Sequence, residues 1–88
     1  MSVRPMMVLL SDKAERTRKR ELHRALAKLP DADDRLRKIM DNMSRMIVRK
    51  LLRDPMIRFG EVAGKDEENE YWKLFHDMFD LEKERKSL

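Results

Sequence analysis

The chain has no cysteine, and only two of its 88 residues are glycine and three are proline. Without cysteine it has no disulfide, no thiolate nucleophile and no cysteine-based zinc site. Long apolar runs are missing as well: the longest, Met6–Leu10, has five residues, against the roughly 20 that a membrane-spanning helix needs. The N-terminus also lacks the pattern of a signal peptide. These absences predict a soluble, cytoplasmic protein with no membrane partner.

The residues that are abundant favour helix. Leu, Met, Lys, Arg, Glu and Ala lose little side-chain freedom in a helix, and they dominate the composition. No stretch alternates apolar and polar residues as a half-buried strand does. The sequence therefore predicts an all-α fold. A chain this short forms one small domain with a thin core, which a partner subunit would help to cover.

Charge is distributed unevenly along the chain. Residues 1–30 carry eight Lys and Arg and three Asp and Glu, a net charge of +5. Residues 55–88 carry six Lys and Arg and nine Asp and Glu, a net charge of −3. A basic front and an acidic rear indicate either charge complementarity across a symmetric interface or a solubilising surface.

The first predicted helix begins at Pro5 or at Ser11 and ends near Leu29, before Pro30. Its middle, residues 13–20, is almost entirely polar, and a helix that is polar all round is typical of a connector. We therefore expect residues 1–30 to be the end of a connector helix and residues 31–88 to form a helical domain.

The second predicted helix has the clearest apolar pattern, and Asp31, Asp33 or Asp34 can cap its start. Apolar residues recur along it at intervals of four, three, four and four: Leu36, Met40, Met43, Ile47 and Leu51. Ile39, Met46 and Leu52 widen this face. A face this wide needs more than one neighbouring helix to cover it, which predicts pairing as a helical dimer.

Two further helices are expected, which makes about four in all. Asp54-Pro55 is predicted to end the second helix and begin a short third one that stops at Gly64. Asp66 is a candidate cap for the last helix. That helix holds four of the five aromatic residues, namely Tyr71, Trp72, Phe75 and Phe79, so it is predicted to supply the bulkiest part of the core.

The residues offer little catalytic chemistry. The Asp31–Asp34 cluster resembles the start of a calcium loop, but Leu36 and Asn42 stand where glycine and a bidentate glutamate are required. His23 and His76 have no ligand or carboxylate spacing around them, and no glycine-rich phosphate loop is present. We expect no catalytic, cofactor-binding or metal-binding residue in this chain, and no enzymatic activity from it alone.

One alternative function remains open, which is nucleic-acid binding. Lys13, Arg16, Arg20 and Arg24 recur at intervals of three and four, so they form a basic row that can follow phosphates. Glu15 and Glu21 are placed to pair with this row, and no aromatic residue is interleaved for base stacking. A free-standing nucleic-acid binder and a solvated helix face both fit this pattern.

Several segments resemble a known family. The most specific is the string Lys50-Leu51-Leu52-Arg53-Asp54-Pro55 followed by Arg58, which is similar to the C-terminal dimerisation domain of glutamyl-tRNA reductase. Residues 21–29 resemble the end of that family's long connecting helix, and Met78-Phe79-Asp80-Leu81 its closing motif. The resemblance covers about residues 14–82.

The resemblance implies a role without catalysis. The whole enzyme of this family uses NADPH to reduce glutamyl-tRNA to glutamate-1-semialdehyde in tetrapyrrole (porphyrin and heme) biosynthesis. Its catalytic cysteine and its dinucleotide-binding fold have no counterpart in this sequence, so glutamyl-tRNA would be bound only by other domains. What carries over is homodimer formation. The residues expected at the dimer interface or in the core are Leu36, Met40, Met43, Ile47, Leu51, Leu52, Phe75 and Phe79.

Overall fold

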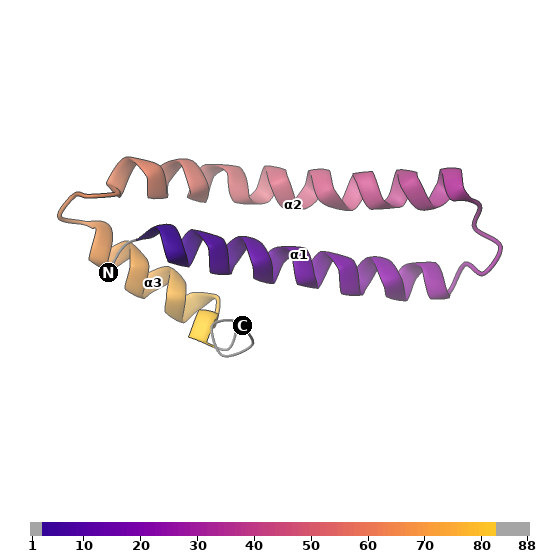
Figure 1. Cartoon of the computed structure of the whole chain (residues 1–88), viewed down its shortest axis with the longest axis horizontal. Helices are drawn as coiled ribbons and strands as arrows, with labels where there is room; N and C mark the ends of the chain where they lie inside the picture. The colour runs from indigo at the N-terminus through magenta and orange to yellow at the C-terminus, as the bar shows by residue number, and fades with distance from the viewer. Residues whose placement is uncertain (1–2, 83–88) are drawn as a thin grey trace.

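A computed structural model describes residues 3–82, which form three helices and, within that range, no strand: α1 (Val3–Ala27), α2 (Asp34–Val62) and α3 (Glu68–Met78). The long helices α1 and α2 form an antiparallel hairpin, and α3 folds back beside the first half of α1 (Figure 1). The molecule is elongated, 53 × 25 × 17 Å. The all-α prediction is confirmed. Residues 1–2 and 83–88, which the two expected segments include, lie outside the described residues.

Helix α1 begins at Val3 and not at Ser11. Pro5 stands in its first turn, where the missing N–H would have no partner within the helix. The helix ends at Ala27, and two turn hydrogen bonds, from Lys28 N to Ala25 O and from Leu29 N to Leu26 O, close it. Of the three candidate caps for α2, Asp33 is the one used, because its Oδ1 accepts a hydrogen bond of 2.8 Å from Leu36 N.

The expected break at Asp54-Pro55 is wrong, because α2 continues through Pro55 to Val62. The chain therefore has three helices where about four were expected. A proline inside a helix costs about 3 kcal/mol or more. Phe59 and Val62, one and two turns later, are fully buried, and burying two such side chains contributes about 1.5–3 kcal/mol each. Tertiary packing thus outweighs the local signal. Gly64, with φ +77°, follows the end of α2 as predicted.

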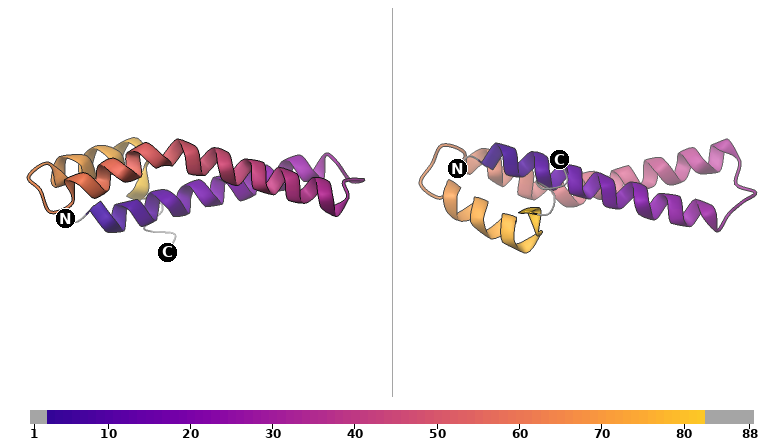
Figure 2. Two further views of the ribbon diagram at one scale, coloured as in Figure 1. Left: turned by 90° about the horizontal axis from the view of Figure 1, so that it is seen from above. Right: turned by 60° about the horizontal axis from the view of Figure 1, so that its bottom comes forward.

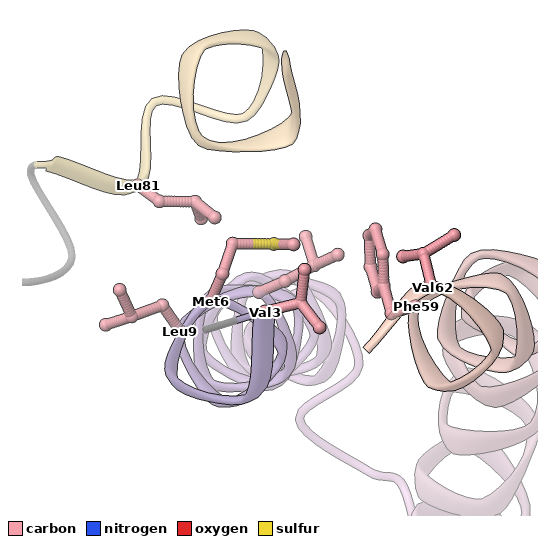
Figure 3. Close-up of a cluster of buried hydrophobic side chains, with 7 residues drawn as sticks. Val3, Met6, Leu9, Phe59, Val62 and Leu81 are labelled. Atoms are coloured by element: carbon pink, nitrogen blue, oxygen red, sulfur yellow. The ribbon is translucent and has the colours of Figure 1, made fainter. Parts of the chain in front are cut away.

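The core lies at one end of the molecule. Its buried side chains come from the start of α1, the end of α2 and the segment after α3 (Figure 3): Val3, Met6, Leu9, Leu10, Phe59, Val62 and Leu81. The prediction that the last helix supplies the bulkiest part of the core is wrong, since α3 contains no fully buried residue. Its aromatic side chains are half-buried around this cluster, and the rings of Phe59 and Phe75 meet edge to face at 4.7 Å.

Helix α3 runs parallel to the first half of α1. Val3 N donates a hydrogen bond of 3.1 Å to Glu68 Oε2 at one end of α3, and Lys13 Nζ contacts Phe79 O at the other. The N-cap of α3 is Glu67 and not Asp66, and its side chain makes no capping hydrogen bond. With eleven residues, α3 spans about 16 Å, less than a third of the length of the molecule. In the part of the chain that the structure describes, the rest of the hairpin consists of α1 and α2 alone (Figure 2).

Candidate dimerisation surface

A row of apolar side chains on α2 faces solvent. We call Leu36, Met40, Met43, Ile47 and Leu51 the α2 stripe. Met40 is half-buried and the other four are exposed, with Met43 at 54% and Leu51 at 72%. Ile39, beside the stripe, is exposed as well. A contiguous exposed apolar surface of this kind is typical of an interaction site.

The α2 stripe lies on the same side of the hairpin as α3, beyond the end of α3. Arg58 marks this side of α2, because its Nε donates a hydrogen bond of 2.9 Å to the Tyr71 hydroxyl of α3. Leu51 stands two helical turns before Arg58, and the rest of the stripe continues at steps of three or four residues. Within residues 3–82, no third helix covers this half of the hairpin. We call it the open half.

A buried charged group holds α1 and α2 together within the open half, level with the middle of the α2 stripe. The Arg18 side chain is only 2% exposed. Its guanidinium donates hydrogen bonds to Glu15 on its own helix at 2.5 and 2.9 Å, and across the hairpin to Asp41 Oδ1 at 2.7 Å and Ser44 Oγ at 3.1 Å. These bonds hold the pKa of the Glu15 and Asp41 carboxyls below their ordinary values. The sequence does not reveal this cluster, because Arg18 stands in a polar stretch of α1 and its partners Asp41 and Ser44 lie on the other helix.

The structure divides the basic row on α1. Lys13 reaches the carbonyl of Phe79, at the end of α3. Arg20 and Arg24 lie farther along α1, where both are exposed, and Arg24 Nη1 is 3.2 Å from Glu21 Oε1. Arg16 is also exposed. Nothing in this arrangement tests the nucleic-acid alternative, which stays a prediction.

Three of the residues expected at the interface or in the core lie near the core end. Leu52 and Phe75 are half-buried and pack against the buried cluster. Phe79 is partly exposed and stacks on Phe75, with the ring centroids 5.8 Å apart. The structure thus separates the expected set into the α2 stripe in the open half and side chains that complete the core within the chain.

Across residues 3–82, no three His, Cys, Asp or Glu side chains come together in a way that could hold a metal ion. None of the three described helices has the length and apolar character needed to cross a membrane. His76 is half-buried and stacks on Trp72 at 4.8 Å. A groove between α1 and α2 is lined by Met46 and Met56 together with Arg45, Arg49 and Arg53.

Comparison with known proteins gives a consistent result. The profile of the family described as "Glutamyl-tRNAGlu reductase, dimerisation domain" matches residues 1–81. The chain is 34% identical to a glutamyl-tRNA reductase of Natranaerobius thermophilus over 91% of the chain and 18% of that protein. It is 31% identical to one of Paenibacillus macerans over 94% of the chain, and 32% identical to one of Bacillus thuringiensis over 96%, each match covering 19% of the relative. No solved structure shows a significant match.

The chain thus spans about a fifth of the length of these relatives. The match extends over nearly the whole chain, including the string from Lys50 to Pro55 on which the resemblance was based. The resemblance to this family is confirmed, and a dimerisation domain implies self-association. The chain belongs to the glutamyl-tRNA reductase dimerisation-domain family.

Proposed function

We propose that this chain joins two subunits of a glutamyl-tRNA reductase into a homodimer and that the α2 stripe forms part of the interface. The observation that carries the proposal is the exposure of this stripe in the half of the hairpin that α3 does not cover. A two-fold interface brings the same patch of both subunits together, so one stripe can be covered by a second copy of the chain.

The energetics support such pairing. Completing the burial of a half-exposed aliphatic side chain stabilises by about 1 kcal/mol. Burying the five stripe residues of both copies therefore contributes about 10 kcal/mol. This lies within the range of the association cost, which is roughly 4–15 kcal/mol. Among residues 3–82, Arg18 is the one buried charged side chain, and it forms its hydrogen bonds within the chain.

The names of the relatives, glutamyl-tRNA reductase, support a proposal for the whole protein. We propose that the complete protein reduces glutamyl-tRNA with NADPH in the cytoplasm, in tetrapyrrole biosynthesis, and that this chain contributes none of the catalytic residues. Residues 1–30 would be the end of the connecting helix, and residues 31–88 the dimerisation domain. The first turns of α1 also supply the core.

Replacing Met43 with aspartate tests the interface. The new carboxylate would have to lose its water on dimerisation, which is costly without a partner. We expect the wild-type chain to have a solution mass near twice 10.6 kDa, and Met43→Asp to raise the dimer dissociation constant by at least about tenfold. Light scattering coupled to size exclusion, over a concentration series, measures both.

Asn42→Asp is the matched control, because it adds the same charge to the neighbouring exposed position, outside the stripe. Its dimer population is expected to stay close to that of the wild-type chain. A wild-type chain that remains a folded monomer at all concentrations would refute the proposed function. A fully dimeric Met43→Asp variant would remove Met43 from the interface.

A further inference from the structure

The open half of the hairpin combines apolar and basic side chains. The α2 stripe supplies the apolar part. Along α1, the side that carries α3 is marked by Lys13, which contacts Phe79 O. From Lys13, steps of three and four residues lead to Arg20 and Arg24, both exposed, so these side chains continue the same side of α1 into the open half. A helix that packs here would meet an apolar row beside a basic row.

Helix α3 has the complementary character on its outer side. Leu74 and Met78 are exposed, Met78 to 66%. Glu70 and Asp77 are exposed too, and their spacing from Leu74 places all four side chains on neighbouring positions of the helix. The exposed Lys73 stands between Glu70 and Asp77 and offsets one of the two carboxylates, so the outer side of α3 is apolar with a net negative charge. The open half is apolar with a net positive charge along α1, since Glu21 pairs with Arg24 and leaves the charge of Arg20.

From this complementarity we propose that the dimer is reciprocal: the α3 of each copy packs on the open half of the other. Leu74 and Met78 then contact the partner's α2 stripe, and Glu70 and Asp77 lie near Arg20 and Arg24 of the second copy. This arrangement rests on the proposed homodimer. It uses the uneven charge of the chain, since residues 1–30 carry +5 and residues 55–88 carry −3.

Symmetry and size fit this arrangement. Helix α3 lies to one side of the hairpin at one end of its length, and the open half lies at the other end (Figure 2, right). A two-fold axis that crosses the middle of the hairpin at right angles to its length places each α3 over the open half of the other copy. The α2 stripe spans residues 36–51, about 22 Å, and α3 spans about 16 Å, so the open half is long enough. Direct pairing of two stripes would instead leave Leu74 and Met78 in water.

Cross-linking tests the arrangement, because the chain has no cysteine of its own. Met43→Cys and Leu74→Cys are prepared separately, mixed in equal amounts and treated with a short bis-maleimide reagent. Mass spectrometry of the digested products then identifies the linked positions. We expect the link between positions 43 and 74 to exceed the 43–43 and 74–74 links at least severalfold. Val8→Cys replaces Leu74→Cys in the control, since Val8 is exposed but lies on α1.

The outcomes separate the two proposals. A dimer whose main product is the 43–43 link would overturn the reciprocal arrangement and leave the homodimer intact. A monomeric mass would overturn both proposals. The control gives a third outcome. If position 8 links to position 43 as strongly as position 74 does, the reciprocal arrangement is overturned as well.

A charge reversal provides a second, independent measurement. Arg20→Glu with Arg24→Glu is expected to raise the dimer dissociation constant by about threefold to tenfold, because exposed ion pairs contribute little each. Adding Glu70→Lys with Asp77→Lys in the same chain is expected to restore most of the affinity, since the opposed charges are exchanged. If the arginine and the carboxylate substitutions each weaken the dimer and their effects add when combined, with no rescue, the proposed pairing is contradicted.

Discussion

Replacing Phe59 with alanine is expected to lower the free energy of unfolding by about 3–5 kcal/mol. Phe59 is fully buried, and it joins α2 to the start of α1 and, through its ring contact at 4.7 Å with Phe75, to α3. The small core offers few side chains that can move into the space left behind. A chain of this size has a total stability of roughly 4–13 kcal/mol, so a large part of it depends on this one side chain.

Ile57→Ala is the matched control for Phe59→Ala, because Ile57 lies two residues earlier on the same helix and is 52% exposed. We expect a loss of no more than about 1 kcal/mol from it. Urea unfolding followed by circular dichroism at one fixed protein concentration measures both variants, since dimerisation makes apparent stability depend on concentration. Equal losses in the two variants would show that the core is not centred on Phe59.

Arg18→Ala is expected to have the second largest effect, a loss of about 1–3 kcal/mol in the free energy of unfolding. The guanidinium is almost fully enclosed and hydrogen-bonds to Glu15, Asp41 and Ser44. The two carboxylates remain 37–40% exposed, so water can solvate them once the arginine is gone, which limits the loss. Arg53→Ala is the control, because Arg53 is an exposed arginine of α2 that lies outside the α2 stripe. We expect a change of no more than about 0.5 kcal/mol from it.

The same cluster predicts how stability depends on pH. Hydrogen bonds from Arg18 lower the pKa of Glu15 and of Asp41 in the folded state. Between these lowered values and the ordinary values near 4, the unfolded chain binds more protons, so stability falls as the pH falls. We expect the contribution to be complete above about pH 5 and to be lost under more acidic conditions. Urea unfolding from neutral pH down to about pH 3 should therefore show a shallower decline for Arg18→Ala than for the wild-type chain. An identical decline would contradict this assignment.

The positions of the helix ends show where local signals suffice and where they fail. Pro5 and Gly64 lie at helix boundaries as the sequence predicts, because each acts through its own backbone geometry. Pro55 carries an equally clear local signal, yet α2 passes through it. The difference lies in Phe59 and Val62, whose burial requires the last two turns of α2 to stay helical.

The location of the core could not be predicted for a similar reason. Val3, Met6, Leu9 and Leu10 form a short apolar segment of α1, and nothing in the spacing of these residues shows which other helix covers them. The packing of the end of α2 and of Leu81 against α1 decides that, and it leaves the equally apolar α2 stripe without cover. Arg18 is a further example, because its partners Asp41 and Ser44 stand 23 and 26 residues away.

The sequence alone determined the helical class, the apolar spacing of the α2 stripe, the uneven charge and the family. All of these depend on residue type and on spacing within a few turns of helix. Only the tertiary structure decided which apolar residues form the core and which remain open to a second copy of the chain. That choice depends on contacts between residues far apart in the sequence. Most of those contacts join α1 to α2, and α3 adds contacts at only one end of the hairpin, which leaves the other end open.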